Sequence, residues 1–329
     1  MDFPGFSLDM GSLKQARRPD PAVLYDLLIL GGGPAAMTAA IYAARKMLKV
    51  AVITRDFGGQ LLETSDVENW IGYQQINAKD LTSKFEEHVK SFDLPVAMGE
   101  AVARVEKEDE AFKVTTEQGK IYKAWTVLLA TGKHHRSLGV PGEKELLGRG
   151  VAYCATCDAP FYKKKRVVIA GGGNSAFTTA FDLMKVEAAI TMISFSKGWQ
   201  ADAELRKRIE SYEKARLLDN HEIVRIEGKA KVEAVRAKDR KTGAEQTIAC
   251  DGIFVEIGLI SNTAMVKDLV ALNPQGEVEV DCSCRTAVPG FFAAGDVTTV
   301  PYKQIVIAAG EGSKAALAAY DYLAAARKI

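Results

Sequence analysis

Residues 24–36 read Leu24-Tyr25-Asp26-Leu27-Leu28-Ile29-Leu30-Gly31-Gly32-Gly33-Pro34-Ala35-Ala36, and this stretch decides the fold. The apolar run before the glycines is typical of a buried parallel strand, and the Ala-rich run from Pro34 to Lys46 has helical character. Another apolar run, Val50–Ile53, predicts the next strand. The stretch therefore predicts a strand–loop–helix–strand unit, from which doubly wound α/β sheets are built.

The same pattern recurs about 140 residues later. It predicts a strand at Arg166–Ala170, a Gly-rich loop at Gly171–Ala176, a helix at Phe177–Lys185 and a strand at Ile190–Ile193. Two such units indicate two nucleotide-binding domains. The predicted fold class is α/β, with two Rossmann-like, three-layer domains, the second inserted in the first.

The chain is predicted to cross between these domains at two points. Ala130-Thr131-Gly132 ends a predicted strand at 126–129, and Gly258 follows a predicted strand at 252–257. A final helix is expected from about Gln304 to the C-terminus. The predicted organisation is an N-terminal extension (1–21), a first domain (22–132 and 260–329) and an inserted domain (133–259).

Composition excludes several classes of protein. The 329 residues are 47% apolar and 26% charged, which is ordinary for a globular protein with a large core. Forty-three basic and 42 acidic side chains leave a formal charge of +1, so neither nucleic acid nor a membrane is expected as partner. No signal peptide or membrane-spanning run is recognisable, and five cysteines do not suggest a secreted disulfide framework. We expect a cytoplasmic enzyme.

The chemistry is expected at Cys154-Ala155-Thr156-Cys157-Asp158, about fifteen residues before the second Gly-rich loop. A Cys-x-x-Cys pair can close as a disulfide and take up two electrons. The competing interpretation is a zinc half-site, which needs a second ligand pair. Cys282-x-Cys284 is too tightly spaced for the usual zinc knuckle and lies in the other predicted domain. No metal site is therefore predicted.

At this point the chain resembles the low-molecular-weight thioredoxin reductases, over roughly residues 24–325. The matching segments are Gly31–Ala36, Gly58–Leu61, Val67–Trp70, Ala130–Gly132, Cys154–Asp158, Gly171–Ala176, Gly295-Asp296 and Tyr302–Gln304. The resemblance implies an FAD-dependent disulfide oxidoreductase that reduces thioredoxin or a thioredoxin-like protein. It also implies a homodimer built through the first domains.

The resemblance places FAD in the first domain. The pyrophosphate would lie on the first Gly-rich loop, the ribityl chain near Asp296, and the flavin N1–O2 edge at backbone around Gln304 and Ile305. From chemistry alone, Asp296 could instead be a helix or turn cap. The predicted cofactor residues are Gly31, Gly33, Pro34, Ala35, Gln60, Asn69, Ala130, Thr131, Gly132, Gly295, Asp296, Lys303, Gln304 and Ile305.

The resemblance also assigns roles to the redox motif. Cys157 would be the sulfur nearer the flavin, and Cys154 the sulfur that attacks the partner. Asp158 would protonate a departing thiolate, and it could cap the helix start as well.

The second Gly-rich unit departs from the family pattern. NADPH-dependent members carry two acidic residues shortly after the loop and a His-Arg-Arg cluster after the next strand. Here Thr178-Thr179 replaces the acidic pair, and Ser194-Phe195-Ser196-Lys197-Gly198-Trp199-Gln200 replaces the basic cluster. One lysine is a poor substitute for paired guanidinium groups on a 2′-phosphate. The chain resembles the ferredoxin-dependent flavin branch in this respect, so reduced ferredoxin is the expected electron donor.

Three alternatives to this function stay open. One is an NAD(P)H-dependent reductase with atypical nucleotide contacts, and another is an oxidase that passes electrons from small-molecule dithiols to O₂. The third is a non-catalytic, redox-sensing flavoprotein. Cys282 and Cys284 could form a second redox relay, although surface or packing roles are expected. His134 and His135 are interpreted as linker residues.

Overall fold

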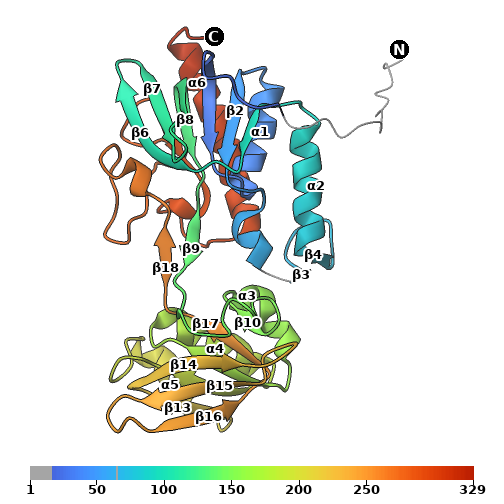
Figure 1. Ribbon diagram of the computed structural model, residues 1–329, viewed down its shortest axis with the longest axis vertical. Coiled ribbons are helices and arrows are strands. Elements are labelled where there is room, and N and C mark those ends of the chain that lie inside the picture. The colour runs from blue at the N-terminus through green and yellow to red at the C-terminus, as the bar shows by residue number, and fades with distance from the viewer. Residues whose placement is uncertain (1–16, 64–65) are drawn as a thin grey trace.

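The computed structural model describes residues 17–63 and 66–329, except the side chains of Glu63, Asp66, Thr156 and Cys157. Figure 1 shows two layered units stacked along the long axis and joined by strands β9 (Lys133–His135) and β18 (Leu259–Ser261). We call the part around the larger sheet the first unit and the other part the second unit. The predicted domain boundaries at 132/133 and 259/260 fall at these joining strands.

The first unit is built on a sheet with strand order β5-β2-β1-β8-β7-β6, and β19 also pairs with β8. Strands β1, β2, β5, β8 and β19 run parallel, whereas β6–β7 and β7–β8 are antiparallel. The bounds are β1 Leu24–Leu30, β2 Val50–Thr54, β5 Val96–Met98, β6 Val102–Glu108, β7 Ala111–Thr116, β8 Ile121–Leu129 and β19 Phe291–Ala293.

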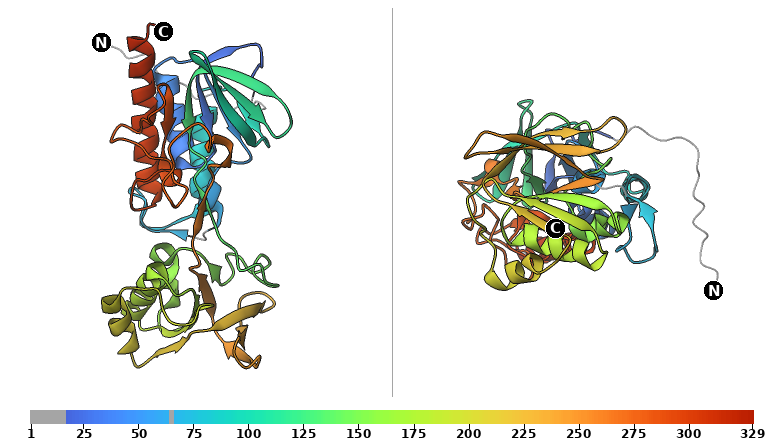
Figure 2. Two further views of the ribbon diagram at one scale, coloured as in Figure 1. Left: turned by 90° about the vertical axis from the view of Figure 1, so that its left-hand side faces the viewer. Right: turned by 90° about the horizontal axis from the view of Figure 1, so that it is seen from below.

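Helices α1 (Pro34–Arg45) and α6 (Ile305–Ala325) pack against each other beside this sheet, and α2 (Ala78–Lys90) packs on α1. Figure 2 shows α6 along one side of the sheet and the β6–β7 hairpin on the other. The two helices approach closely because they are rich in alanine. A Cβ atom on Gly312 of α6 would lie 2.0 Å from the Ala35 carbonyl oxygen, so that position requires glycine. The remaining elements of this unit are η1 Gly59–Glu63, β3 Asp66–Val67, β4 Ile76–Asn77, η3 Ala264–Val266 and η4 Gly295–Val297.

The second unit contains a parallel sheet of order β10-β17-β11-β12-β13 and an antiparallel sheet of order β14-β15-β16. The helices are α3 Ala155–Asp158, η2 Ala159–Tyr162, α4 Asn174–Lys185 and α5 Ala203–Glu210. The strands are β10 Val151–Ala152, β11 Arg166–Ala170, β12 Ala189–Ile193, β13 Ala215–Leu218, β14 His221–Glu227, β15 Ala234–Asp239, β16 Glu245–Ala249 and β17 Gly252–Val255.

The α/β class with Rossmann-like parallel elements is confirmed, and several element bounds are corrected. Helix α4 begins at Asn174, three residues before the predicted start, because the Gly-rich loop runs directly into the helix. Helix α6 ends at Ala325, short of the C-terminus, and β17 ends at Val255. Residues 17–21 of the predicted extension lie on the first unit, where the Arg17 carbonyl accepts a hydrogen bond from Val96 N–H at 2.8 Å. The rest of that extension, 1–16, lies outside the described residues.

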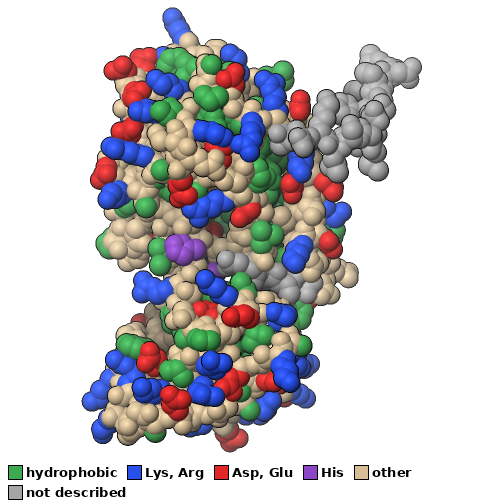
Figure 3. Space-filling model, viewed as in Figure 1, with side chains coloured by type: hydrophobic (Ala, Val, Ile, Leu, Met, Phe, Trp, Pro, Cys, Tyr) green, Lys and Arg blue, Asp and Glu red, His purple; other side chains and the backbone are tan. Residues whose placement is uncertain are grey.

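Charged side chains of both signs are interspersed over both units on the face that Figure 3 shows. Within the described residues, no helix is long and apolar enough to cross a membrane, and no group of three or more His, Cys, Asp or Glu residues could hold a metal ion.

Candidate functional site

The first Gly-rich loop lies at the carboxyl edge of the first sheet. Gly31 follows β1 directly and has a φ of +125°, and a Cβ atom there would lie 2.2 Å from the Ala130 carbonyl oxygen. A side chain would therefore meet both a strained backbone and a filled space, so only glycine fits. Ala130 follows β8, which pairs with β1, and the structure thereby brings these two predicted residues together.

Helix α1 starts from this loop with an open N-terminus. Gly33 is the N-cap and provides no side-chain hydrogen bond, while Pro34 occupies the first turn. A Cβ atom on Gly33 would meet nothing within 4 Å, so the space before the helix is open. The first-turn N–H groups of a helix lack intrahelical partners and carry partial positive charge, which favours a phosphate. Ala35 is buried and packs against Gly295, where an added Cβ would lie 3.0 Å from the Ala35 Cβ.

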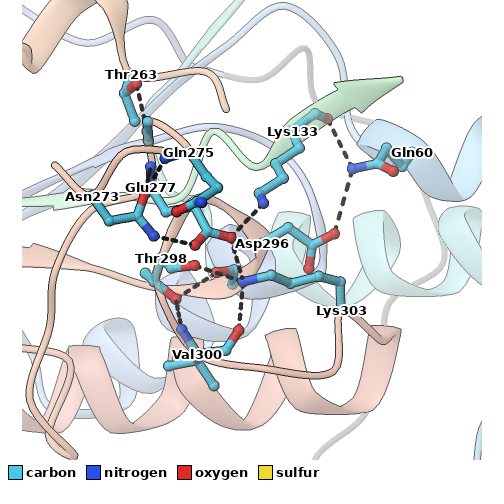
Figure 4. Close-up of polar contacts among 12 residues, drawn as sticks. Gln60, Lys133, Thr263, Asn273, Gln275, Glu277, Asp296, Thr298, Val300 and Lys303 are labelled. Atoms are coloured by element: carbon cyan, nitrogen blue, oxygen red, sulfur yellow. Dashed lines mark hydrogen bonds and ion pairs between the residues drawn. The ribbon is translucent and has the colours of Figure 1, made fainter. Parts of the chain in front are cut away.

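The carboxyl ends of neighbouring strands bring further predicted residues to this edge. Asp296 follows β19, and its Oδ2 lies 3.4 Å from Gln60 Nε2, which also donates to the Lys133 carbonyl at 2.8 Å (Figure 4). Burial raises the pKa of the Asp296 carboxyl group above its usual range, against the opposing effect of the Lys303 and Lys133 charges. Asp296 therefore has a polar partner, Gln60, from a distant segment, and two lysine charges act on its carboxyl group.

The start of helix α6 carries the last predicted cofactor residues. Gln304 is the N-cap without a side-chain capping bond, and Ile305 is the first helical residue. Asn69 Nδ2 donates to Gln304 Oε1 at 3.1 Å, so the β3–β4 loop is tied to this helix start. Lys303 Nζ donates to the carbonyls of Thr298 at 2.6 Å and Val300 at 2.5 Å, which holds the loop that leads into the helix.

Thr131 and Gly132 lie at the crossing between the units. Thr131 Oγ1 donates to the Asn262 carbonyl at 2.7 Å, and Asn262 Nδ2 donates back to the Thr131 carbonyl at 2.8 Å. Gly132 has a φ of +63° and accepts from Asn262 N–H at 3.0 Å. His134 and His135 belong to β9, and His134 Nδ1 lies 2.7 Å from Asn262 Oδ1. These contacts join the two crossing segments.

The redox motif forms the short helix α3 in the second unit. Cys154 is its N-cap and is disulfide-bonded, whereas the side chain of Cys157 lies outside the described side chains. Asp158 is buried at the end of α3. Burial raises the pKa of Tyr162 to about 12, and the negative charge of Asp158 adds to this rise. Helix α3 also contacts β3 of the first unit, so the motif lies where the two units meet (Figure 1).

The other cysteines do not resemble a redox pair. Cys250 and Cys284 are buried and free, and burial raises the pKa of each thiol to about 12. A thiol with so high a pKa is not a nucleophile at neutral pH. Cys282 is free and exposed. One member of the Cys282–Cys284 segment thus faces solvent and the other lies in the core.

The second Gly-rich loop keeps its shape for packing reasons. A Cβ atom on Gly171 would lie 2.3 Å from the Glu256 carbonyl oxygen, and one on Gly172 would lie 2.5 Å from Ser194 Oγ. Thr179, at the second position of the missing acidic pair, donates to Glu256 Oε1 at 2.7 Å. The loop geometry is therefore maintained by contacts within the protein, whether or not a nucleotide binds.

The segment after β12 has no guanidinium group of its own, unlike the basic cluster of NADPH-dependent family members. Phe195 is 56% exposed, and Ser194 is buried and donates to the Ser196 carbonyl at 3.3 Å. An unexpected cation, Arg240, lies beside this segment. Its guanidinium lies 3.7 Å from the centre of the Phe195 ring, and it donates to the Phe195 carbonyl at 2.9 Å. Arg240 comes from the β15–β16 turn, and sequence reasoning missed it because this hairpin was not predicted.

Sequence reasoning also missed a stack beside the redox motif. The rings of His135 and Tyr153 lie 4.5 Å apart, and Tyr153 donates to Glu143 Oε1 at 2.9 Å. Burial and the charge of His134 lower the pKa of His135 to about 4, so this imidazole is neutral at pH 7. The stack connects the crossing strand to the residue before Cys154.

The residues around the first loop fit a bound dinucleotide. They combine an uncapped helix start, open space at the Gly33 Cβ position, and the half-buried carboxylate of Asp296. If FAD binds, Gly31, Gly33, Pro34 and Ala35 would hold the pyrophosphate, and Asp296 a sugar-like hydroxyl.

Comparisons with known proteins agree with this geometry. Residues 25–312 match the family described as "Pyridine nucleotide-disulphide oxidoreductase". The chain is 45% identical over 314 residues to a subunit of the alkyl hydroperoxide reductase from Pseudomonas putida, covering 94% of this chain but 60% of that protein. The chain therefore spans about three fifths of the length of this relative.

Two solved structures resemble the whole chain. The thioredoxin reductase of Streptococcus pyogenes is 37% identical, with a TM-score of 0.86 over 92% of this chain and 99% of that one. The thioredoxin reductase of Lactococcus lactis in its "FR conformation" is 34% identical, with a TM-score of 0.64 over 91% of this chain and 99% of that one.

The family match and these neighbours establish an enzyme class and a cofactor. The protein is a flavin-dependent disulfide oxidoreductase similar to thioredoxin reductases, and its cofactor is FAD. The geometry of the first loop is what such a cofactor requires. On the match over residues 25–312, the chain belongs to the pyridine nucleotide-disulphide oxidoreductase family.

Proposed function

We propose that this protein reduces thioredoxin or a thioredoxin-like protein through a Cys154–Cys157 dithiol. The observation that carries the proposal is the disulfide-bonded Cys154 at the start of α3, where the two units meet. FAD, when bound, supplies the two electrons that open this disulfide. In this arrangement the motif lies where the two units meet, and the proposed cofactor residues Thr131 and Gly132 lie at the crossing between them.

The proposed exchange balances as two thiolate attacks. The Cys154 thiolate attacks the partner's disulfide, forms a mixed disulfide and releases one partner sulfur as a thiolate. Asp158 passes to that sulfur the proton that Cys154 lost in forming its thiolate. Cys157 then loses its own thiol proton and attacks the mixed disulfide, which restores the Cys154–Cys157 disulfide and releases the second partner sulfur. That sulfur takes up the Cys157 proton. The partner gains two electrons and two protons.

We also propose that the electron donor is reduced ferredoxin, which would deliver two single electrons. What supports this is the segment after β12, where Phe195 and Ser196 offer no guanidinium to a 2′-phosphate and Ser194 offers no carboxylate to a ribose. Arg240 favours the alternative, an NAD(P)H-dependent reductase, because it places one cation beside this segment. Its stack on Phe195 and its bond to the Phe195 carbonyl already occupy it.

One anaerobic experiment distinguishes reduced ferredoxin from NAD(P)H as the electron donor. Oxidised FAD-loaded protein is mixed with reduced ferredoxin, NADPH or NADH, and the visible flavin absorbance is followed. We expect reduced ferredoxin to bleach the flavin completely and both pyridine nucleotides to bleach it slowly or not at all. Rapid, saturable bleaching by micromolar NADPH, but not by ferredoxin, would reverse the assignment.

A second candidate partner follows from the relatives. The chain is more similar to the alkyl hydroperoxide reductase subunit of P. putida, at 45% identity, than to the thioredoxin reductase of S. pyogenes, at 37%. The same dithiol could then serve the disulfide of a hydroperoxide-reducing enzyme. Turnover measured in parallel with oxidised thioredoxin and with such an enzyme would decide between the two partners.

We further propose that the protein is a cytoplasmic homodimer.

We also propose that the predicted inserted domain (133–259) rotates against the first domain. The two solved neighbours support this rotation. They share nearly the same identity and coverage with this chain, yet their TM-scores are 0.86 and 0.64. Divergence in sequence does not explain this gap, whereas different placements of similar domains do.

Locking the present arrangement should separate two activities. A non-reducible crosslink between α3 and β3 is expected to leave reduction of the Cys154 disulfide intact, because that step needs the motif at the interface. It should abolish turnover with thioredoxin, because the motif cannot then reach a protein disulfide. The control is the same crosslinker placed within the β14–β16 sheet. Normal thioredoxin turnover by the locked enzyme would refute the rotation.

A further inference from the structure

Lys133 and Lys303 both form ion pairs with the carboxylate of Glu277, next to the proposed cofactor residue Asp296. Glu277 Oε1 lies 2.5 Å from Lys133 Nζ and 3.5 Å from Lys303 Nζ (Figure 4). The side chains are largely enclosed, with exposed fractions of 8% for Lys133, 15% for Glu277 and 21% for Lys303. Because both ammonium groups contact the same oxygen atom, they lie next to each other and repel, and the negative charge of the carboxylate offsets this repulsion.

The surrounding hydrogen-bond donors require a carboxylate at position 277. Its other oxygen, Oε2, accepts from Asn273 Nδ2 at 2.6 Å, so donors surround both oxygens. Burial acts to raise the pKa of Glu277, but hydrogen bonds from Lys133 and Asn273 and both lysine charges hold it below its usual value. A glutamine here would have one acceptor oxygen and would turn an N–H₂ group toward a donor.

Each lysine is tied to a different part of the site. Lys303 is bonded to the carbonyls of the loop that leads into α6. Lys133 begins the crossing strand β9, and its carbonyl accepts from Gln60, which also contacts Asp296. The cluster therefore connects the start of α6, the half-buried Asp296 carboxylate and the first residue of the crossing.

We propose that Glu277 is a positioning residue of the flavin site, which offsets one of the two positive charges of Lys133 and Lys303 and so sets the local charge at the start of α6. The inference rests on the proposed cofactor contacts of Asp296, Lys303 and Gln304. With Glu277 neutral, the cluster carries one more positive charge. Positive charge near a flavin favours its electron-rich reduced form.

The test compares four variants of the FAD-loaded protein by their flavin midpoint potentials. Glu277→Gln adds one net positive charge and is expected to shift the reduction equilibrium at least about tenfold toward the reduced form, or about 30 mV for a two-electron couple. Lys133→Met removes one positive charge and should shift the potential in the opposite direction. The double variant has the wild-type net charge and should return close to the wild-type potential. Glu279→Gln, on the same loop and exposed, is the matched control.

A second readout needs no flavin and separates this inference from the proposed function. In urea unfolding of the FAD-free protein, Glu277→Gln should lower stability more than Glu279→Gln, and adding Lys133→Met should restore part of the loss. A Glu277→Gln potential no different from that of Glu279→Gln would overturn the inference, as would a double variant that keeps the full shift. Failure to reduce any protein disulfide, with these shifts present, would refute the proposed function alone.

Discussion

Replacing Cys154 or Cys157 with serine is expected to lower turnover with a thioredoxin-like partner by at least about 10³-fold, as for loss of a catalytic nucleophile. A serine hydroxyl group cannot form a disulfide bond, and at neutral pH it cannot attack one. Neither variant can form the disulfide, so in both the flavin should accept electrons that cannot pass on to a partner. The variants differ in the sulfur that remains. Cys157→Ser keeps Cys154, which can attack a partner disulfide and stop at a mixed disulfide, whereas Cys154→Ser keeps only the sulfur proposed to lie nearer the flavin.

The matched control is Cys282→Ser, because Cys282 is free and exposed. It should retain wild-type turnover. The measurement is steady-state reduction of the partner's disulfide, combined with anaerobic titration of the flavin in each variant. Undiminished turnover in either the Cys154 or the Cys157 variant would exclude the dithiol mechanism.

The second large effect concerns NADPH. Phe195, Ser196 and Gln200 stand where family members have guanidinium donors to a 2′-phosphate, and each charge-assisted hydrogen bond contributes about 1.5–3 kcal/mol. We therefore expect kcat/KM for NADPH to lie at least about 10³-fold below that of a reductase with the basic cluster. Restoring guanidinium groups with Phe195→Arg and Ser196→Arg together should recover much of this loss.

Two further variants make that result interpretable. Phe195→Leu removes the ring without adding charge, and it should not improve the use of NADPH. Arg240→Ala tests the alternative function, because Arg240 is the cation that the structure places on Phe195. If the residual NADPH activity falls tenfold or more in Arg240→Ala, then Arg240 contributes to nucleotide binding and the atypical NAD(P)H site gains support.

The two Rossmann-like units could be predicted because their local sequence pattern agrees with the tertiary structure. An apolar strand, a Gly-rich turn and an Ala-rich helix specify a Rossmann-like unit from neighbouring residues alone, and both copies formed as expected. The antiparallel additions were missed, in particular the β14–β16 sheet, because these strands are half-exposed and do not follow a strong alternating pattern. The start of α4 was misplaced because loop and helix share residues at Asn174.

By itself, the sequence determined the class of chemistry: a Cys-x-x-Cys-Asp motif and two nucleotide-type loops, which short-range spacing and turn geometry encode. Only the tertiary structure decided what surrounds those motifs. Glu277 lies far from Lys133 in the chain, and Arg240 lies far from Phe195, yet each pair is in direct contact. Such contacts arise because parallel strands deliver their carboxyl ends to one edge of a sheet, and hairpins fold back upon it. Electrostatic energies depend on distance in space and on burial, so no local pattern reports them.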